Sequence, residues 1–312
     1  MLIPANLSRS FNILPVVEPL AINVASSKGI HLDCLRLDKM HPFVSGNKWY
    51  KLKYHVLEAQ RAKKSSILSF GGAYSNHLHA LAYLGHSLKI QTVGVVRGEE
   101  PVILSPTLQD CVRWGMQLKW LKRSEYRLIK SAQCLGSYSN KFPDAWIIPE
   151  GGAGEYGLKG IEMLFNELKQ KGLLHYDLFC CPVGSGTTFA GMVKANLGRC
   201  ECLGFSALKR ANDLESRVEQ ALNSSASVNP WSICHDYHFG GFAKVNSRLL
   251  DFISKIYQQH NFLLDPIYTG KMLYGLSEYI YQGRIKSGAR ILMVHTGGLQ
   301  GWRGFGDKSP AV

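Results

Sequence analysis

The stretch Pro182-Val-Gly-Ser-Gly-Thr-Thr-Phe-Ala-Gly191 joins an apolar run to an expected helix. The run, residues 177–183, is typical of a strand buried on both faces, and the helix is expected over 188–197. Backbone N–H groups at a helix N-terminus favour an anion, and glycines let the backbone approach it closely. No lysine follows the second glycine, and the spacing misses the dinucleotide fingerprint. The loop therefore predicts a cradle for one compact phosphate, with an ordinary strand–helix turn as the alternative.

Further apolar runs and amphipathic stretches alternate on both sides of this loop. Strands are expected at residues 66–70, 91–96, 146–148, 202–205 and 291–294. Helices are expected at residues 51–64, 106–116, 156–171, 213–223, 246–260 and 273–282, with Ser105 as an N-cap before Pro106. This alternation predicts an α/β protein with mostly parallel sheets and helices on both faces.

Length and composition indicate a soluble globular protein. The 312 residues favour two domains, and the 46% hydrophobic and 19% charged fractions are ordinary for such a protein. No apolar stretch reaches the roughly 18 residues that span a membrane, and no secretory signal is visible. The eight cysteines contain no C-x-x-C pair. We therefore expect a cytoplasmic protein with reduced thiols and no metal site.

The charge balance is basic. Lys and Arg number 36 against 23 Asp and Glu, which gives a net charge of +13 at pH 7. Such a surplus suits nucleic acid, a membrane surface or acidic small ligands. The charges are scattered, however, and we find no helix-turn-helix, zinc-finger or RNA-binding motif. We expect a small substrate and neither nucleic acid nor membrane as a partner; a nucleic-acid-binding protein stays the remote alternative.

Two more polar turns follow predicted strands, and ligands bind at the carboxyl ends of strands in parallel sheets. The first is Phe70-Gly-Gly-Ala-Tyr-Ser-Asn-His77, which precedes a helix expected to start near Leu78. The second is His295-Thr-Gly-Gly298 after the last strand, where His295 is expected to be structural. Helix caps and hydroxyl-stabilised turns are the alternative interpretations.

A lysine completes the pattern. Ser45-Gly-Asn-Lys48 stands just ahead of the helix expected from Lys51. A lysine in this place is usually a solvated helix end, but a lysine amine with a lowered pKa forms a Schiff base with an aldehyde. Pyridoxal phosphate (PLP) is the common cofactor that needs one lysine and one phosphate site.

Together these motifs resemble the 1-aminocyclopropane-1-carboxylate deaminase/D-cysteine desulfhydrase family. The resemblance spans residues 10 to 305 and rests on six ordered segments: Ser45–Lys48, Gly71–His77, Pro149-Glu-Gly-Gly152, Val183–Thr188, Asp265-Pro-Ile-Tyr-Thr-Gly-Lys271 and His295–Gly298. It implies the PLP-dependent, tryptophan synthase β-like fold (fold type II), with two three-layer αβα domains. Residues 1–49 and 153–312 would form the large PLP-binding domain, and residues 50–152 the smaller inserted domain. It also implies a homodimer.

The resemblance assigns a role to each site residue. Lys48 would hold PLP and move the proton at the substrate α-carbon, and Asn76 would hydrogen-bond the PLP phenolic oxygen. Ser75 and Tyr268 would be catalytic, with Tyr268 near the substrate. The remaining assignments are Ser185, Gly186, Thr187 and Thr188 at the phosphate, Thr296 at the pyridine nitrogen, and Tyr74, Ser75, Asn76 and His77 at the substrate.

The resemblance also guides the choice between the two activities. In the deaminases a glutamate follows the tyrosine of the D-P-x-Y segment, and here that position is Thr269. Neutral Thr269 and Thr296 would leave the ring nitrogen largely unprotonated, which favours β-elimination from D-cysteine to pyruvate, ammonia and hydrogen sulfide. The alternative is deaminase activity, ring opening to 2-oxobutanoate and ammonia. Tyr74 and Phe242 depart from the family pattern, so another substrate stays open, and a protein that binds ligand without turnover is a remote alternative.

Overall fold

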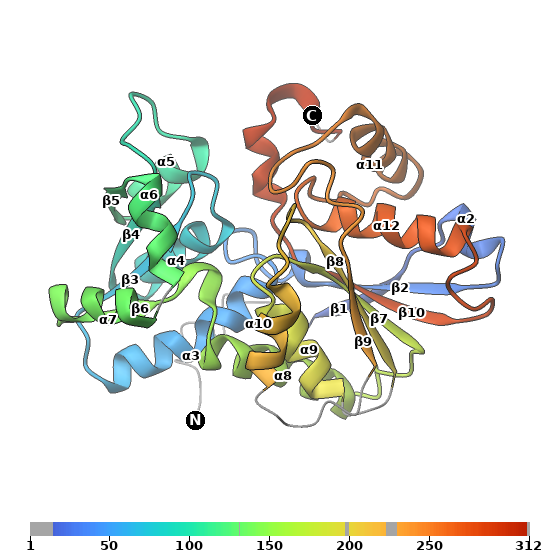
Figure 1. Ribbon diagram of the computed structural model, residues 1–312, viewed down its shortest axis with the longest axis horizontal. Coiled ribbons are helices and arrows are strands. Elements are labelled where there is room, and N and C mark those ends of the chain that lie inside the picture. Colours follow the sequence, from blue (N-terminus) through green and yellow to red (C-terminus); the bar gives the residue numbers. More distant parts are fainter. Residues whose placement is uncertain (1–14, 131, 197–199, 223–229, 311–312) are drawn as a thin grey trace.

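A computed structural model describes residues 15–130, 132–196, 200–222 and 230–310 of the chain. It contains two sheets, each with helices on its faces (Figure 1). The predicted α/β class with mostly parallel sheets in two domains is confirmed. The predicted domain limits at residues 50 and 152 stay a prediction. The predicted helix ends Leu197 and Asn223 lie outside the described residues.

The larger sheet has six strands in the order β1-β2-β10-β7-β8-β9. Its strands are β1 (Val16–Pro19), β2 (His31–Arg36), β7 (Leu178–Val183), β8 (Glu201–Ser206), β9 (Trp231–Cys234) and β10 (Arg290–His295). Only the edge strand β1 is antiparallel to its neighbour. Strands β7 and β10 lie side by side at the centre, so the loops that follow them emerge together at one sheet edge.

The smaller sheet has four parallel strands in the order β5-β4-β3-β6. They are β3 (Ser66–Gly71), β4 (Gln91–Arg97), β5 (Gln117–Leu121) and β6 (Ala145–Ile148). The sequence patterns predicted β3, β4 and β6 as buried runs. They missed β5, whose exposed and half-buried residues include polar side chains because it is an edge strand.

Helices cover both faces of each sheet. On the larger sheet, α2 (Asn23–Ser26), α11 (Ser247–His260) and α12 (Thr269–Tyr281) pack on one face. The other face carries α8 (Glu155–Gln170), α9 (Thr187–Asn196) and α10 (Leu214–Leu222). Helix α3 (Asn47–Arg61) packs against α8 and also contacts β3 and β6 of the smaller sheet. On the smaller sheet, α4 (Asn76–Leu88) and α5 (Pro106–Arg113) lie opposite α6 (Arg123–Tyr126) and α7 (Ala132–Lys141).

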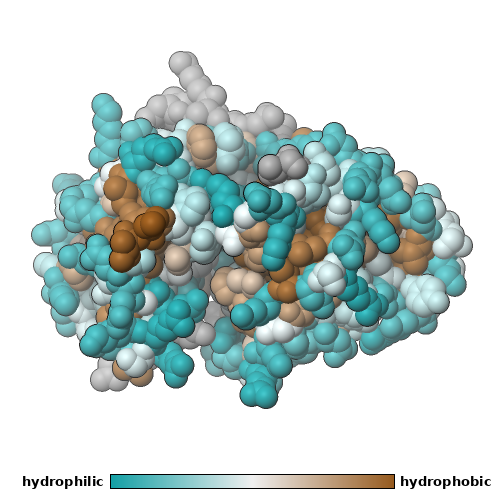
Figure 2. All heavy atoms as spheres, turned by 90° about the horizontal axis from the view of Figure 1, so that it is seen from above, coloured by the Kyte–Doolittle hydropathy of each residue, from teal (hydrophilic) through white to brown (hydrophobic). Residues whose placement is uncertain are grey.

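Short 3-10 helices complete the described secondary structure: η1 (Leu37–Lys39), η2 (Arg127–Lys130), η3 (Glu150–Gly152), η4 (Leu299–Gly304) and η5 (Gly306–Lys308). None of the helices in the described part of the chain has the length and apolar content that a bilayer crossing requires. Seen from above, the surface is mostly hydrophilic with separate hydrophobic patches (Figure 2).

Three helices begin two or more residues earlier than the sequence patterns predict, and each correction concerns the site. Helix α3 starts at Asn47 and not at Lys51, so Lys48 lies in its first turn. Helix α4 starts at Asn76 behind the Ser75 cap, and α12 starts at Thr269 instead of Leu273. The first turns of α3 and α12 are buried but include polar side chains, so a pattern of apolar residues does not reveal them.

Candidate active site

The site forms where the loops after β10 and β7 meet the first turns of α3 and α9. The Asn47 N–H donates to the Thr296 carbonyl at 3.2 Å. A Cβ on Gly46 would lie 1.8 Å from the Thr296 carbonyl oxygen, and Gly46 has a φ of +73°. Only glycine allows this approach, because other residues lack the space and avoid this backbone conformation. The turn at Gly46 thus brings the start of α3 to the end of β10.

Lys48 lies next to the predicted phosphate loop. Its Nζ donates to Asn47 Oδ1 at 2.6 Å, and Asn47 Nδ2 donates to Thr188 Oγ1 at 2.8 Å. Among the described residues, Lys48 has no carboxylate in ion-pair contact. Burial lowers the pKa of the Lys48 amine to about 8, with the Asp265 charge partly opposing the shift. Roughly a tenth of the amine is therefore neutral at pH 7, far more than for an ordinary lysine, and the neutral amine is the form that attacks an aldehyde.

The loop from Gly184 to Thr188 opens α9, as the sequence predicts. Gly186 has a φ of +88°, and the Ser185 and Thr187 hydroxyl oxygens lie 3.3 Å apart. Hydroxyl groups and the free N–H groups at the start of this ten-residue helix make a cradle for an anion.

Lys51 is a site residue that the sequence patterns missed. It lies one turn after Lys48 on the same face of α3, and its Nζ donates to Ser185 Oγ at 3.3 Å. The side chain is buried, and burial together with the Lys48 charge holds the pKa of Lys51 well below its usual range. A buried amine beside the cradle would take up a proton and pair with a bound phosphate. The i, i+3 spacing from Lys48 was the available signal.

We expect Lys51→Met to weaken the binding of a phosphate-bearing cofactor by about tenfold to a hundredfold, the size of a lost hydrogen bond to a charged group. The measurement is an equilibrium titration followed by cofactor absorbance. Lys53→Met is the matched control, because Lys53 is on the same helix and its Nζ contacts Met163 Sδ at 3.1 Å. Wild-type affinity in Lys51→Met would contradict this role for Lys51.

The turn before α4 places Tyr74, Ser75 and Asn76 beside the turn after β10. Ser75 caps the helix, with its hydroxyl accepting from the Leu78 N–H at 3.2 Å. The Asn76 amide lies against Gly298, where a Cβ would be 2.7 Å from Asn76 Nδ2. The Tyr74 side chain is partly exposed and its ring lies beside Gly304. The fold therefore brings Asn76 to the same edge as Thr296.

His77 is buried and its tautomer follows from its partner. Ser69 Oγ donates to the Ile148 carbonyl at 2.8 Å, so the same oxygen accepts from His77 Nε2–H at 2.7 Å. His77 Nδ1 is then an acceptor, buried and without a partner among the described residues. Burial and the charges of Lys51 and Lys48 lower the pKa of His77 well below its usual range. The neutral ring can accept a hydrogen bond at Nδ1 but cannot donate one to a carboxylate there.

Tyr268 and Thr269 are held by one buried carboxylate. Asp265 accepts from the backbone N–H groups of Ile267, Tyr268 and Thr269 at 3.0, 2.8 and 2.8 Å, respectively. The Thr269 hydroxyl donates to Asp265 Oδ2 at 2.5 Å, so it is engaged within its own turn. The Tyr268 ring lies next to Gly184, whose Cβ position would be 3.0 Å from Tyr268 Cε1. Tyr268 thus contacts the cradle. Thr269 is engaged with Asp265, whereas Thr296 lies in the turn that directly follows β10.

Phe242 lies against Tyr268, with the ring centroids 6.1 Å apart, and its side chain is partly exposed. The loop that carries it is fastened by the buried Lys271, whose Nζ donates to the carbonyls of His238 and Gly241 at 2.9 and 2.7 Å.

His295 is structural, because its Nε2 contacts the Leu263 carbonyl at 3.0 Å and its Nδ1 lies 3.3 Å from Asp38 Oδ1.

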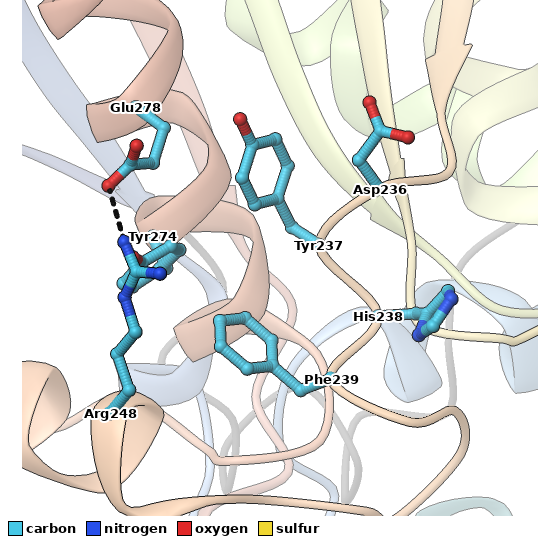
Figure 3. Close-up of a pocket in the computed structure, with 7 residues that line it drawn as sticks. All are labelled: Asp236, Tyr237, His238, Phe239, Arg248, Tyr274 and Glu278. Atoms are coloured by element: carbon cyan, nitrogen blue, oxygen red, sulfur yellow. Dashed lines mark hydrogen bonds and ion pairs between the residues drawn. The ribbon is translucent and has the colours of Figure 1, made fainter.

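A separate hollow of about 290 Å³ lies between α11, α12 and the loop after β9 (Figure 3). An ion pair from Arg248 to Glu278, 3.4 Å long, closes one side, and Arg248 also lies over the Tyr274 ring. The residues lining the hollow are Asp236, Tyr237, His238, Phe239, Arg248, Tyr274 and Glu278. They include no lysine and no glycine-rich loop, so this hollow does not match the predicted cofactor site.

The residues around Lys48 fit a small aldehyde that carries a phosphate. Lys48 supplies an amine with a lowered pKa, while Lys51 and the start of α9 supply the phosphate contacts. The hydrogen bonds through Asn47 connect these two parts of the site. Pyridoxal phosphate has both required groups.

Comparisons with known proteins agree with this geometry. The model of the family "Pyridoxal-phosphate dependent enzyme" matches residues 22–297. An Arabidopsis thaliana protein named bifunctional D-cysteine desulfhydrase/1-aminocyclopropane-1-carboxylate deaminase, mitochondrial, is 28% identical over 83% of this chain and 70% of its own length. A Serratia proteamaculans protein named D-cysteine desulfhydrase is 25% identical over 85% of this chain and 86% of its own length.

A solved structure described as an ACC deaminase homologue is similar along the whole chain. It has a TM-score of 0.81 with 23% sequence identity, and the match covers 98% of each chain. This likeness confirms the predicted fold.

Proposed function

Because this chain belongs to the family of pyridoxal-phosphate dependent enzymes, we propose that it catalyses β-elimination from a small amino acid, with D-cysteine as the expected substrate. One D-cysteine and one water would give pyruvate, ammonia and hydrogen sulfide. The Cα–H and Cβ–S bonds break, the sulfur leaves with the electron pair, and water replaces the amino group. The members of the site would be the residues that the resemblance assigns, together with Lys51.

The proposed roles follow from the placement of each group. When bound, pyridoxal phosphate supplies an aldehyde for the substrate amine and withdraws electrons from the substrate α-carbon. Lys48 Nζ would accept the α-proton, a role that its lowered pKa supports. Ser185, Gly186, Thr187 and Thr188 would hold the phosphate with Lys51. Asn76 would donate to the phenolic oxygen of the cofactor.

The substrate would lie between the start of α4 and Tyr268. Ser75 and the backbone N–H groups near it would bind the substrate carboxylate, because a helix N-terminus favours an anion. Tyr74 is partly exposed at this turn, and His77 would contribute an acceptor at Nδ1. Tyr268 would stand on the other side, near the cradle. Burial, with the Asp265 charge, raises the pKa of the Tyr268 hydroxyl, so this group would act as a neutral donor.

The main support for β-elimination is that Thr296, the residue proposed to face the pyridine nitrogen, has a neutral side chain. Thr296 would meet that nitrogen, and the Thr269 hydroxyl is engaged by Asp265. A neutral hydroxyl leaves the nitrogen largely unprotonated, and the resulting weaker electron sink suffices where a thiolate leaves. Deaminase activity on 1-aminocyclopropane-1-carboxylate is the second candidate, because the Arabidopsis relative is named for both activities.

The test supplies both substrates to the purified, PLP-loaded protein and measures 2-oxo acid release. We expect pyruvate and sulfide from D-cysteine, and no 2-oxobutanoate from the cyclopropane substrate. Release of 2-oxobutanoate at a comparable rate would overturn the argument from Thr296. If neither substrate released a 2-oxo acid while PLP was bound, the substrate assignment would be wrong. Tyr74 and Phe242, which depart from the family pattern, would then be the residues to vary.

We also propose a cytoplasmic homodimer. The resemblance supports the dimer, and the state of the thiols supports the compartment. The cysteines that the structure describes in full are unpaired and buried, which suits a reducing environment.

A further inference from the structure

A row of side-chain hydrogen bonds runs from the C-terminal segment to Asn76. Arg303 Nη1 lies 2.7 Å from Asp110 Oδ2, and Arg303 Nη2 donates to Gln300 Oε1 at 3.2 Å. Thr107 Oγ1 donates to the same Gln300 oxygen at 2.9 Å. Gln300 Nε2 in turn donates to Asn76 Oδ1. The row therefore links η4 and α5 to the first turn of α4.

Arg303 determines which way each amide in this row faces. A guanidinium only donates hydrogen bonds, so the Gln300 atom facing Arg303 must be the carbonyl oxygen. The Gln300 NH2 group then faces Asn76 and requires an acceptor, which is the Asn76 carbonyl oxygen. The Asn76 NH2 group is left on the opposite side. The orientation of one amide thus follows from the other.

The free end of Asn76 faces the turn after β10. Asn76 Nδ2 would be 2.7 Å from a Cβ on Gly298, whereas Oδ1 would be 3.8 Å from it. Gly297 packs on Ser45 and Gly46, so this turn also borders the start of α3, which carries Lys48. The NH2 group is therefore presented at the edge where the proposed cofactor binds.

We infer that Gln300 is a positioning residue, which holds the Asn76 amide so that its NH2 group donates to the phenolic oxygen of the cofactor. The inference rests on the proposed function, because it needs PLP at Lys48. A donor at this oxygen stabilises its deprotonated form and lowers its pKa. With the amide reversed, a carbonyl oxygen would face the phenolate and raise that pKa.

The test is Gln300→Glu, which keeps the size of the side chain and offers only acceptors to Asn76. The Asn76 NH2 group should then turn toward the introduced carboxylate, leaving its carbonyl toward the cofactor. We expect the pKa of the bound cofactor's phenolic oxygen to rise by about one unit or more. The measurement is a pH titration of the PLP-loaded protein, monitored by the absorbance of the cofactor. We also expect the cofactor affinity to fall by about tenfold.

Two more variants separate orientation from folding. Gln300→Met removes the orienting amide without charge, and we expect a smaller shift in the same direction. Thr107→Val leaves Arg303 donating to Gln300 Oε1, so its titration should match the wild type. A wild-type titration in both Gln300 variants, with PLP still reducible onto Lys48, would overturn this inference alone. Absence of PLP from Lys48 in the wild-type protein would instead overturn the proposed function.

Discussion

Lys48→Ala should abolish the covalent attachment of pyridoxal phosphate and lower turnover by on the order of 10⁴-fold or more, as removal of an essential nucleophile does. Lys48 has a half-buried side chain and an amine with a pKa of about 8, and hydrogen bonds through Asn47 connect it to the phosphate cradle. The measurements are the absorbance of the bound cofactor and 2-oxo acid release. Lys53→Ala, on the same helix, is the control and should retain both properties.

Two buried lysines elsewhere in the chain make this experiment decisive. Lys51 donates to Ser185, and Lys271 donates to two backbone carbonyls. If Lys48→Ala still held PLP that borohydride fixes to the protein, one of these lysines would be the attachment site. Lys48 would then not be the attachment site.

Gly46→Ala should unfold the junction between α3 and β10 and destabilise the protein by about 3 kcal/mol or more. The added Cβ would lie 1.8 Å from the Thr296 carbonyl oxygen, and that oxygen belongs to the backbone and cannot move aside freely. The positive φ of Gly46 adds conformational strain. We expect a lower unfolding midpoint in denaturant and the loss of PLP binding.

Gly301→Ala is the matched control for this prediction. Gly301 lies in η4, and a Cβ there would meet Ile267 Cδ1 at 3.5 Å, an ordinary contact. We expect only a small change in stability and PLP binding. A Gly46→Ala protein with the stability of Gly301→Ala would show that the two backbones do not approach as closely as described.

Most interior strands and the order of the motifs were predictable from sequence. Strands β3, β7 and β10 are buried through most of their length, so each appears as a continuous apolar run between turn residues. Strands β1, β2 and β9 were missed. Strands β1 and β9 are short edge strands with half-buried or exposed positions, while β2 includes His31, Asp33 and Arg36. An apolar run is absent where a strand carries polar side chains.

Some site residues were likewise predictable from sequence, and others were not. The glycine-rich loop before α9 and the turn before α4 were predicted because their residue types are unusual for their positions. Lys51 and Gln300 were missed because a lysine within a helix and a glutamine near a C-terminus are ordinary in any sequence. Their roles depend on Ser185 and Asn76, which are 134 and 224 residues away in the chain. Only the fold brings these pairs together.

The most direct test of the central claim is to reduce the PLP-loaded protein with borohydride, digest it and locate the pyridoxyl group by mass spectrometry. We expect the group on the peptide that contains Lys48 and nowhere else. Attachment to Lys51 or Lys271, or PLP that binds without becoming fixed to the chain, would contradict it.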